Sequence, residues 1–578
     1  MNNKIYFKTK EFNNIKEIIY NSANVYEKNT AFVIKNKKDG KTNYIDVSYK
    51  QLLEDINCLG TAYYSLKLQK KRIAIIGKNR YEWVLAHLAN LLGGIVSIPL
   101  DKDLQLEELE SSLIRSKADA IVFDNKLLDL IEQIKNRGNT QIKEYICMEK
   151  ESYYKNIPEL IDIGKALIEK GNTSYIDNII DENEMNILLF TSGTTSKSKA
   201  VMLSQKNVAS NIYALQCVED IRSSDTNIAF LPFHHIFGST CLIMMLASGV
   251  RTCFPDGLRY IKQNLKEYKV SVFVGVPVLV EAIYKAIIKE VEKQGKTKII
   301  NKAIKISNFL LKLHIDIRKI LFKKVLEGLG GKLRLIILGG APADPMSIKG
   351  FNEIGVTTIQ GYGLSETAPV ISAENYKKMK AGSVGFPMIN DIIEIVNKDE
   401  KGIGEIRVKG PNVMLGYYEM PELSNETIKN GWFYTGDLGY FDKKGFLYIT
   451  GRNKNLIVLK NGKKVFPEEL ETLINRLELV NECIVFGMPD KKDRNDITLS
   501  VKVVYNEETI KEKYNEKTRD EIDKILWGEI KQINTTFPRY KHIQKLITSN
   551  EELIKTTTKK VKRQEEIKLI MQQENSKE

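Results

Sequence analysis

The residues best suited to chemistry form a run of hydroxyl side chains after an apolar stretch near position 190. The sequence LLFTSGTTSKSKAVMLS, Leu188 to Ser204, contains Thr191, Ser192, Gly193, Thr194 and Thr195, and then Lys199. Hydroxyls, free backbone N–H groups and a glycine that tolerates positive φ can cradle phosphate oxygens, and the lysine adds positive charge. The run is not a P-loop, because Ser198 stands at the second glycine position and Ala200 follows the lysine. A polar hairpin turn without a ligand would share this composition, so both interpretations stay open.

Three further turns carry groups that suit a nucleotide. In GYGLSET, Gly361 to Thr367, Glu366 takes the last glycine position of a GxGxxG motif, and a carboxylate there suits Mg²⁺. Leu335–Leu338 ends in GGAP, whose small side chains let a flat ring approach the backbone. Asp437 in YTGD is suited to ribose hydroxyls, although an isolated TGD is also a common turn.

The elements that must position these residues are those of an α/β protein. Lys71–Asp101 predicts a βαβ unit, with a strand over Arg72–Gly77, a helix over Tyr81–Leu92 and a strand over Ile95–Pro99. Further strands are expected at Ala120–Phe123, Tyr145–Met148, Asn227–Leu231, Val270–Val276, Leu333–Leu338 and Thr357–Gln360. The first 340 residues or so are therefore expected to form parallel sheets covered by helices.

The second half of the chain changes character twice. From about Gly382, short strand signals alternate with turn residues, which predicts a small antiparallel sheet or barrel. Beyond Gly451 the pattern becomes α+β, with helices expected at Glu468–Arg476 and Arg519–Thr535. We expect two domains, 1–451 and 452–578, the first containing α/β subdomains and a small β-barrel-like subdomain, the second smaller and mobile.

Together these motifs resemble those of the adenylate-forming (AMP-binding) superfamily, which includes acyl-CoA synthetases, adenylation domains and luciferases. Six motifs occur in the family's order: FTSGTTSKSKAV, LPFHHIFG, GGAP, GYGLSET, YTGD with GRNKN, and KTTTKKVKR. Matching elements run from Lys71 to Arg563, so the resemblance covers nearly the whole chain. It implies an ATP-dependent ligase that joins a carboxylic acid to the thiol of coenzyme A through an acyl-adenylate.

The resemblance also assigns the nucleotide site. Thr191–Thr195 and Lys199 match the pyrophosphate loop, and Glu366 with Thr191 matches the Mg²⁺ site. The adenine wall and the ribose contacts match the following residues: Gly340, Ala341, Tyr362, Gly363, Thr367, Asp437 and Arg452.

Three more positions matter for the reaction by the same resemblance. Lys560 matches the lysine needed for adenylation, and Lys454 matches the hinge on which the C-terminal domain swings. His235 matches a position beside the acyl pocket. We therefore expect Lys560, Thr191, Glu366 and His235 to be catalytic, although His235 alone would be an ordinary core residue and the stretch around Lys560 a basic tail.

The sequence departs from the family at several positions. Ser196, Ser198 and Ala200 replace the glycine, proline and glycine of the usual TTGxPKG loop. Gln205 stands where a histidine is common, and Lys559 replaces the usual glycine before the catalytic lysine. Fewer glycines leave the loop less backbone freedom, which would slow its closure. Because the hydroxyls and charged groups remain, we favour a variant of an active loop over a catalytically impaired nucleotide- or lipid-binding homologue.

The acid substrate is expected to be a fatty acid. The acyl pocket should be lined from Phe233–Ala247, Val272–Leu279 and Gly339–Ala341, where apolar residues dominate and no charge could fix an amino group or a second carboxyl group. The insertion Lys285–Lys324, followed by GLGGKLRLIILGGAP, resembles the long-chain branch of acyl-CoA synthetases. We expect a long-chain acid first and a medium-chain acid second. The rival is an enzyme that loads a carrier protein instead of coenzyme A.

Composition narrows the partners. The chain has 87 Lys and Arg against 73 Asp and Glu, a net charge of +14 that fits nucleotides and phosphorylated cofactors. No stacking-aromatic or base-reading motif supports nucleic-acid binding. Six scattered cysteines and the absence of a secretory signal favour the cytoplasm. His234–His235 has no acidic or cysteine partner at metal-ligand spacing in the sequence, so no structural zinc site is expected.

Two segments raise the question of a membrane. The uncharged run Thr226–Val250 contains Pro232 and two histidines, so we do not expect it to span a bilayer. Lys285–Lys324 has twelve Lys or Arg residues against three acidic ones, with apolar residues at helical spacing. Such a helix can lie on an anionic surface as a peripheral contact at the membrane's inner face. The alternative, a helix packed on the body with lysines facing water, is favoured.

Overall fold

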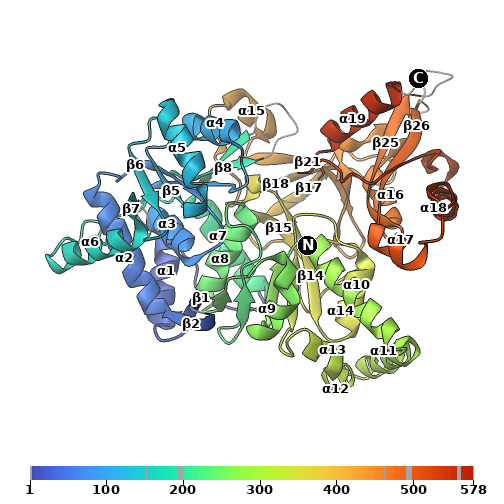
Figure 1. The fold of residues 1–578 in the computed structure, drawn as a ribbon, viewed down its shortest axis with the longest axis horizontal. Coiled ribbons are helices and arrows are strands. Elements are labelled where there is room, and N and C mark those ends of the chain that lie inside the picture. The colour runs from blue at the N-terminus through green and yellow to red at the C-terminus, as the bar shows by residue number, and fades with distance from the viewer. Residues whose placement is uncertain are drawn as a thin grey trace.

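The computed structural model describes residues 3–38, 40–150, 153–191, 199–460, 462–489, 497–555 and 561–576. The predicted phosphate-loop residues Ser192, Gly193, Thr194 and Thr195, together with Lys560, lie outside these described residues. Within them, the strands form two large sheets, a smaller antiparallel sheet, a three-stranded C-terminal sheet and a two-stranded ribbon (Figure 1).

The first large sheet has eight strands among the described residues, in the order β19-β9-β8-β4-β3-β5-β6-β7. The strands are β3 (Arg72–Ile76), β4 (Val96–Leu100), β5 (Ala120–Phe123), β6 (Glu144–Cys147), β7 (Lys155–Asn156), β8 (Met185–Thr191), β9 (Lys199–Ser204) and β19 (Gly416–Tyr417). β3 and β4 pair in parallel through α3 (Tyr81–Leu92), which confirms the predicted βαβ unit. β8 and β9 form an antiparallel hairpin at the sheet's other side, and β19 extends it.

The second large sheet has nine strands in the described parts of the chain, in the order β16-β15-β14-β13-β12-β10-β11-β1-β2. They are β1 (Thr30–Lys38), β2 (Lys41–Ser48), β10 (Thr226–Ile228), β11 (Arg251–Cys253), β12 (Val272–Gly275), β13 (Leu335–Leu338), β14 (Thr357–Gly363), β15 (Val370–Ala373) and β16 (Phe386–Pro387). The strands from β14 to β1 in this order are parallel, and antiparallel strands close both edges. The predicted α/β class is confirmed.

One layer of helices joins the two sheets. The largest apolar core combines side chains of β1 and β3 with α2 (Tyr49–Ser65), α3, α7 (Gln205–Val218) and α8 (Ile236–Ala247). α3 is rich in apolar residues, and 11 of its 12 residues are buried, including the polar His87 and Asn90. α1 (Ile15–Val25) and α6 (Ile157–Glu169) contribute to the same core.

Other helices cover the outer faces. Alternate residues of β3, Ala74 and Ile76, pack on the opposite face with α4 (Leu106–Ser116) and α5 (Leu128–Arg137). The nine-stranded sheet is covered by α9 (Ile261–Glu267), α10 (Pro277–Lys293), α11 (Thr297–Lys312), α13 (Lys323–Gly328) and α14 (Pro345–Glu353), with α12 (Arg318–Leu321) between α11 and α13. Short 3₁₀ turns are η1 (Asn125–Leu127) and η2 (Leu258–Tyr260).

The uncharged run Thr226–Val250 divides into β10, a loop and α8, which agrees with the sequence interpretation. Across the described ranges, no helix combines the length and the apolar character needed to cross a membrane. β10 ends earlier than predicted, at Ile228, because the side chain of Asn79 donates to the carbonyls of Ala229 (2.9 Å) and Leu231 (2.7 Å) and holds this stretch as a loop.

The antiparallel sheet predicted after Gly382 is present. It comprises β17 (Ile392–Val396), β18 (Gly404–Lys409), β20 (Ile428–Lys429), β21 (Trp432–Phe441) and β22 (Leu447–Arg452), with α15 (Pro421–Thr427) beside it. β21 pairs with both β18 and β22, so Asp437 on β21 lies opposite Arg452 on β22.

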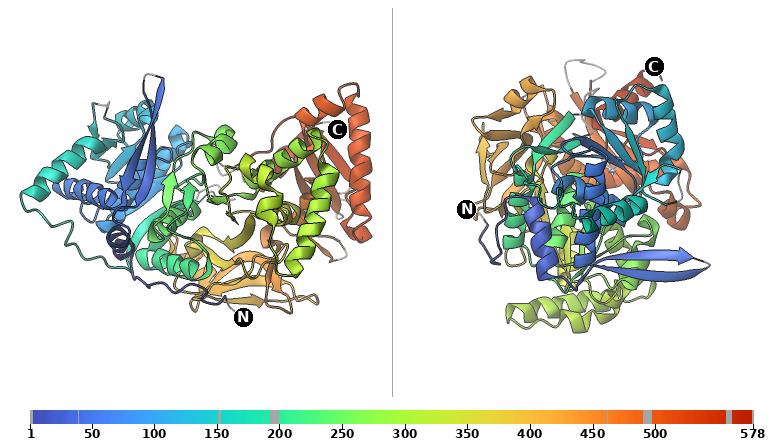
Figure 2. Two further views of the ribbon diagram at one scale, coloured as in Figure 1. Left: turned by 90° about the horizontal axis from the view of Figure 1, so that it is seen from below. Right: turned by 90° about the vertical axis from the view of Figure 1, so that its left-hand side faces the viewer.

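Residues 453–576 form an α+β body at one end of the molecule (Figures 1 and 2). After η4 (Asn453–Asn455), its elements are β23 (Ile457–Val458), β24 (Lys464–Val465), α16 (Pro467–Ile474), β25 (Val480–Pro489), β26 (Ile497–Tyr505), α17 (Glu507–Lys513), α18 (Arg519–Asn534), η5 (Arg539–Lys541), β27 (Lys545–Ser549) and α19 (Arg563–Asn575). Its main apolar core is separate from those of the large sheets. Ion pairs Arg476–Asp344 (2.8 Å) and Lys289–Glu512 (2.9 Å) join it to the rest.

The N-terminal segment reaches back to the far end of the nine-stranded sheet. The Asn3 amide donates to the carbonyls of Ala373 (3.0 Å) and Phe386 (3.1 Å), and the Asn3 backbone N–H donates to Pro387 (2.9 Å). Asn3 thereby joins β15 to β16, next to the strand that carries the GYGLSET motif.

Candidate active site

The β8–β9 hairpin carries the first predicted site residues. Thr191, the last residue of β8, pairs with Lys199, the first of β9, and its hydroxyl donates to the Lys199 carbonyl at 3.2 Å. The Lys199 ammonium lies 4.9 Å from the ring centre of Tyr417 on β19. Burial is the main reason why the pKa of Lys199 is lowered, and the positive charge of Lys454 lowers it further, whereas Glu366 acts against both.

Glu366 is held beside this hairpin. It lies in η3 (Ser365–Thr367), its carbonyl accepts from Met414 N (2.9 Å), and its carboxylate accepts from the Tyr417 hydroxyl (2.8 Å). Since Tyr417 pairs with Val201 on β9, the sheet fixes Glu366 near Lys199. Burial raises the pKa of Tyr417, so its hydroxyl stays a donor. A carboxylate and the Thr191 hydroxyl are oxygen ligands of the kind that Mg²⁺ prefers, so these two residues fit the predicted metal.

Asp437, Tyr362 and Arg452 form a connected group. The Tyr362 hydroxyl donates to Asp437 Oδ2 at 2.7 Å, and Arg452 Nε lies 3.0 Å from Asp437 Oδ1. Burial is the main reason why the pKa of Tyr362 is raised, and the Asp437 charge is the main reason why the pKa of Arg452 is raised. The structure therefore brings together a flat ring, a buried carboxylate and a guanidinium. The two that are most distant in sequence, Tyr362 and Arg452, are 90 residues apart.

The GGAP turn lies alongside Tyr362. In parallel register Leu338 on β13 is opposite Gln360 on β14, so Gly340 and Ala341 follow the end of one strand where Gly361 and Tyr362 continue the other. Gly340 has φ of +83°, which favours glycine. A Cβ on Gly339 would lie 2.8 Å from the ring of Phe237, so a larger residue there would force this ring to shift.

The three segments predicted to line the acyl pocket meet at this point, because Gly339 adjoins Phe237 on α8 and Gly340 adjoins Val276 after β12. Phe237 and Val276 also pack, together with Ile337 on β13, against an apolar cluster that contains Leu231, Met245, Val250, Val272, Val274, Leu335 and Ile359. Val276 and Gly339 follow the carboxyl ends of β12 and β13, where open α/β sheets bind ligands.

His235 precedes α8, and its ring lies 4.2 Å from that of His234, centre to centre. Asp101, directly after β4, places a carboxylate oxygen 3.2 Å from His234 Nε2. Ligand atoms of Asp101, His234 and His235 lie within 4.8 Å of one another. The spacing in the sequence could not reveal this acidic neighbour, because Asp101 is 133 residues from His234 and the fold brings them together.

Residues 19–418 match the family described as AMP-binding enzyme, and residues 454–573 match the AMP-binding enzyme C-terminal domain. The chain belongs to the AMP-binding enzymes. Long-chain-fatty-acid–CoA ligase 5 of Mus musculus is 29% identical over 475 residues, covering 76% of this chain and 69% of the relative. The long-chain-fatty-acid–[acyl-carrier-protein] ligase AEE15, chloroplastic, of Arabidopsis thaliana is 25% identical over 563 residues, covering 84% and 76%.

A solved structure shares the fold of this AMP-binding enzyme. O-succinylbenzoate coenzyme A synthetase (MenE) from Bacillus subtilis, in complex with ATP and a magnesium ion, gives a TM-score of 0.70 at 21% identity. The match covers 95% of this chain and 99% of that chain. The large α/β part and the smaller C-terminal body are thus the fold of adenylate-forming ligases.

Three other predicted residues of this AMP-binding enzyme, Thr367, Lys454 and Gly363, lie outside the two groups described above. Thr367 is fully buried, and its hydroxyl donates to Pro369 O at 2.6 Å, so it fixes the turn that presents Glu366. Lys454 is exposed in η4, immediately after Arg452 and Asn453. Gly363 lies on β14, where a Cβ would meet the Pro369 carbonyl at 1.8 Å, so the turn requires glycine there.

The residues that flank the segment containing Lys560 are held by hydrogen bonds. Lys555 and Val561 form a β-bridge, and Lys562 N donates to Ile554 O at 2.7 Å. The buried Glu566 carboxylate accepts from Ile554 N (2.8 Å) and pairs with Lys502 Nζ (2.6 Å). Both ends of the stretch around Lys560 are therefore attached to β26 and α19.

Tyr417, Asp101 and Asn79 were missed by sequence reasoning. Besides donating to two carbonyls, Asn79 accepts from Phe233 N (3.0 Å) and so shapes the loop that carries both histidines. None of the three belongs to a motif, and each acts across more than 50 residues, so only the fold reveals it.

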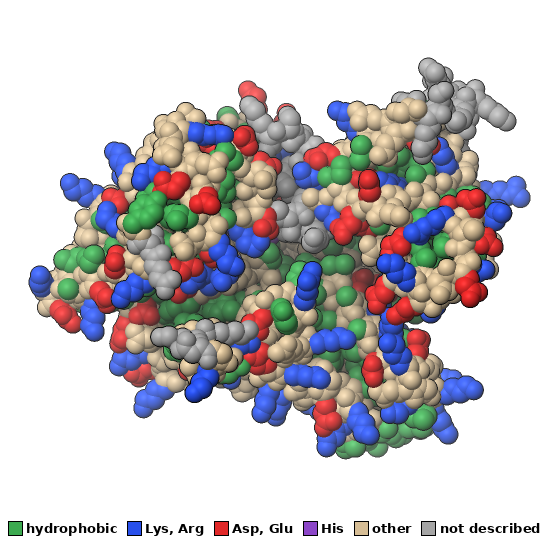
Figure 3. Space-filling model, in the orientation of Figure 1, with side chains coloured by type: hydrophobic (Ala, Val, Ile, Leu, Met, Phe, Trp, Pro, Cys, Tyr) green, Lys and Arg blue, Asp and Glu red, His purple; other side chains and the backbone are tan. Residues whose placement is uncertain are grey.

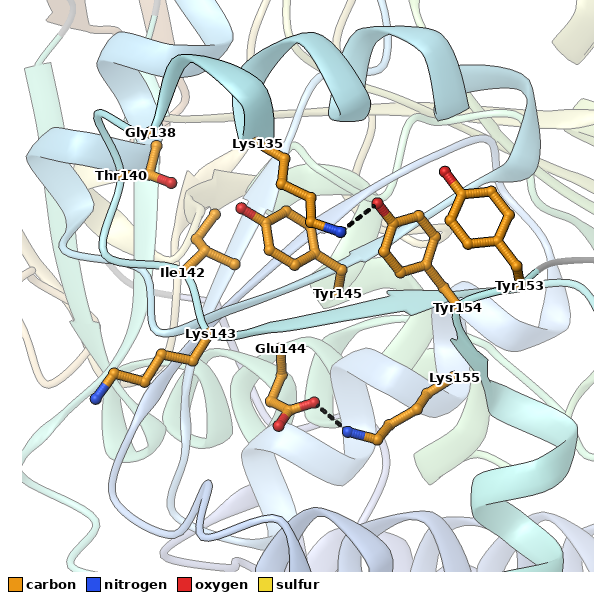
Figure 4. Close-up of a pocket in the computed structure, with 10 residues that line it drawn as sticks. All are labelled: Lys135, Gly138, Thr140, Ile142, Lys143, Glu144, Tyr145, Tyr153, Tyr154 and Lys155. Carbon is orange, nitrogen blue, oxygen red and sulfur yellow. Dashed lines mark hydrogen bonds and ion pairs between the residues drawn. The ribbon is translucent and has the colours of Figure 1, made fainter.

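A hollow of about 470 Å³ lies elsewhere, at the β6–β7 edge of the eight-stranded sheet (Figure 4). Two of its lysines have partners in the hollow: Lys155 pairs with Glu144 (2.7 Å), and Lys135 donates to the Tyr154 hydroxyl (3.0 Å). It contains none of the predicted site residues and lies at the opposite edge from β8 and β9, so it is separate from the nucleotide site.

Proposed function

We propose that this AMP-binding enzyme activates a long-chain fatty acid as acyl-AMP and transfers the acyl group to coenzyme A. One observation carries the proposal: Tyr417 joins Glu366 to Lys199, Asp437 joins Tyr362 to Arg452, and the GYGLSET segment carries both Tyr362 and Glu366. This arrangement supports a single site for the carboxylate proposed to bind the metal and the residues proposed to bind the ribose.

In the first step, a carboxylate oxygen of the acid attacks the α-phosphorus of ATP, a P–O bond forms, and pyrophosphate leaves. Two anionic groups about 4 Å apart repel by roughly 4 kcal/mol at an effective dielectric near 20. The Lys560 ammonium and the Lys199 ammonium would offset this repulsion where negative charge develops. Mg²⁺ held by Glu366 and Thr191, when bound, supplies a further positive charge to the phosphate oxygens.

The nucleotide would be held by the residues that the family motifs mark. Asp437 would accept from ribose hydroxyls, and Tyr362 with Gly340 and Ala341 would flank the adenine. The hydroxyls of Ser192, Thr194 and Thr195 and the backbone of Gly193 would hold the phosphates. MenE, which shares this fold, was solved with ATP and magnesium.

In the second step, the sulfur of coenzyme A attacks the acyl carbon, a C–S bond forms, and AMP leaves. The thiol must approach from the side that Lys560 occupies during the first step. We propose that residues 452–578 form a domain that swings about Lys454 between the two steps, so that one arrangement serves each reaction.

The apolar character of the acyl region supports a fatty acid. Phe237, Val276 and Ile337 pack on an apolar cluster, and these positions offer no charge for an amino group or a second carboxyl group. The mouse relative is named as a long-chain-fatty-acid–CoA ligase. We place the reaction in the cytoplasm, since all six cysteines are free thiols.

A carrier protein is the second candidate acceptor, because the Arabidopsis relative is named as an acyl-carrier-protein ligase. The two acceptors are distinguished by incubating the full chain with ATP, Mg²⁺ and a panel of acids from short to long, with either coenzyme A or holo-carrier protein. We expect AMP formation and acyl-CoA only with coenzyme A, and the highest kcat/KM with long-chain acids.

Acyl transfer to the carrier protein alone would reject coenzyme A as the acceptor.

The Lys560→Ala variant should lose at least about 100-fold in acid-dependent pyrophosphate release, as expected for a removed charge contact in a transition state. If neither the parent nor the variant releases pyrophosphate with any acid, the chain is a catalytically impaired homologue and the proposal fails.

A further inference from the structure

The helical insertion between β12 and β13 extends beyond what a crossover needs. α10 alone returns the chain along the sheet, whereas α11 and α12 continue outward at the lower right of Figure 1. The views in Figure 2 agree that α11 lies on the outer side of the molecule. The proposed reaction uses none of its side chains, so its composition needs another explanation.

α11 has two apolar faces rather than one. Ile300, Ala303 and Ile304 pack on the core beneath, as in an ordinary surface helix. A second stripe, formed by Ile299, Ile306, Phe309 and Leu313, is exposed to 66, 46, 62 and 56% respectively. Because these residues follow one another at intervals of seven, three and four, they lie along one side of the helix.

Further exposed apolar side chains follow the helix. α11 ends at Lys312, and His314 adopts φ of +61°, which turns the chain. Ile315 and Ile320 follow in the turn and in α12, and Ile320 is 80% exposed. We call Ile299, Ile306, Phe309, Leu313, Ile315 and Ile320 the outer apolar face. Large contiguous apolar patches are rare on free protein surfaces and mark interaction sites.

Positive charge surrounds the outer apolar face. Residues 296–324 include nine Lys or Arg residues and one acidic residue, Asp316. Lys298, Lys305 and Lys312 repeat every seven residues along one flank of the stripe, and all three are exposed. No carboxylate in the described part of the chain pairs with any of these three. Figure 3 shows blue and green side chains together over this region at the lower right.

We propose that the outer apolar face and its lysines dock on an anionic lipid bilayer, with α11 lying in the plane of the headgroups. Apolar side chains would enter the acyl boundary, and the lysines would contact lipid phosphates, as in interfacial amphipathic helices. A second copy of this chain fits poorly, because each face would bring an excess of eight positive charges against its twin. One face of α11 thus packs on the body of the protein, while the outer apolar face remains exposed.

The test is co-sedimentation of the full chain with vesicles of phosphatidylcholine, with or without one third phosphatidylglycerol. We expect the protein to pellet with the anionic vesicles, to remain in solution with the neutral ones, and to be released by high salt. The charge variant is Lys298→Glu/Lys305→Glu/Lys312→Glu, and the apolar variant is Ile306→Ser/Phe309→Ser. Each should weaken vesicle binding at least about 100-fold, because each lysine contact contributes about fivefold and each large buried apolar side chain at least about tenfold.

Matched controls carry the same changes elsewhere. Lys401→Glu/Lys443→Glu/Lys444→Glu changes the net charge equally at exposed positions outside the face, and Ile179→Ser removes a side chain that is 91% exposed. Both controls should bind vesicles like the parent, and all variants should keep the parent's melting temperature. Equal loss in the charge variant and its control would mean bulk attraction only and would overturn the proposal.

Two other results would also overturn it. Binding to neutral vesicles that is unaffected by either face variant would place the contact elsewhere. A dimer detected by light scattering, and abolished by Ile306→Ser/Phe309→Ser, would assign the face to a second copy. Because vesicle binding is measured without substrates, its failure leaves the proposed reaction untouched.

Discussion

At the residue scale, Tyr417 holds the orientation of Glu366. It is 4% exposed, its hydroxyl donates to the Glu366 carboxylate at 2.8 Å, and its ring lies beneath the Lys199 ammonium. The neighbouring Tyr418 points the other way and accepts from Arg72 at 2.7 Å. Tyr417 therefore contacts the candidate site, whereas Tyr418 contacts Arg72, so the same substitution at Tyr418 is a matched control for one at Tyr417.

We expect Tyr417→Phe to lower kcat/KM for acid-dependent pyrophosphate release about 10- to 100-fold, the range for a hydrogen bond to a charged group. The Mg²⁺ concentration needed for half-maximal rate should rise, because Glu366 loses its positioning donor. Tyr418→Phe should change neither quantity more than about twofold. Equal effects of the two substitutions would contradict a positioning role for Tyr417.

Glu374, after β15, is a buried carboxyl group that supports the same turn. It is 2% exposed and accepts from Lys380 N (2.7 Å) and Gln360 N (3.3 Å), the latter just before the GYGLSET turn. Burial raises the pKa of Glu374 to about 7. Its pKa is higher in the folded than in the unfolded chain, so its stabilising contribution is complete below about pH 4.5 and is lost as the pH rises through about 7.

We therefore expect the parent's melting temperature to fall between pH 5 and 8, since the rise in the pKa of Glu374 corresponds to about 3 kcal/mol. Glu374→Gln should remove most of this slope. The variant should be no more stable than the parent at low pH, because its amide leaves one backbone donor without an acceptor, and more stable at pH 8. Parallel melting curves across this range would reject the assignment.

Much of the site could be predicted at this scale, because its residues lie in motifs whose local spacing carries the chemistry. Asp437 and Arg452, for instance, come from separate motifs that β21 and β22 pair directly. Asp101 and Tyr417 could not be predicted, because their partners are distant in sequence and no local pattern marks them.

At the element scale, the helices of the N-terminal half pack unusually closely at one crossing. A Cβ added to Gly164 on α6 would lie 1.8 Å from the Cys58 carbonyl oxygen on α2. Gly528 on α18 is also in a helix, but a Cβ there would meet nothing within 4 Å. The same substitution at these two positions tests packing against intrinsic helix propensity.

We expect Gly164→Ala to lower stability by about 1 to 3 kcal/mol, the cost of overpacking, because the two backbones must separate. Gly528→Ala should raise stability by up to about 1 kcal/mol, since alanine is the better helix former. Differential scanning calorimetry resolves the transitions of the two cores. A neutral Gly164→Ala would show that α2 and α6 are not in close contact.

The bounds of helices and strands that have a regular apolar pattern were predicted best, because that pattern alone indicates the element. The bounds of α3 and β5 agree with the sequence expectation, as α3 is rich in apolar residues and β5 is wholly buried. β10 was predicted too long, since the Asn79 side chain competes for its last carbonyls. The helical spacing through Leu313 and Ile317 is interrupted at His314, whose positive φ the apolar pattern does not reveal.

At the scale of the whole molecule, the C-terminal body is attached by a short connection and polar contacts. Exposed or half-exposed ion pairs such as Lys289–Glu512 contribute little to stability, because water and salt screen them. Breaking such weak contacts adds little to the free-energy cost of moving the C-terminal body. This supports the proposed swing about Lys454, which the sequence could suggest only by resemblance.

We expect Lys454→Pro to lower overall acyl-CoA formation at least about tenfold while one half-reaction is retained. Proline fixes φ near −65° and disfavours the helical conformation of the preceding Asn453, so rotation at this point is restricted. Lys454→Ala keeps the backbone free and should remain close to the parent. Pyrophosphate release without coenzyme A and thioester formation from added acyl-AMP measure the two steps, and an equal loss in both would contradict the hinge.

The attachment of Asn3 to β15 and β16 has a consequence for biosynthesis. Its two acceptor carbonyls lie 370 and 383 residues further along the chain. At roughly 5 to 20 residues per second, the ribosome needs roughly 20 to 80 s to supply the second of them. During that time the Asn3 side chain lacks its two native acceptors, so the edge of the sheet beside β14 can close only after translation has passed Pro387.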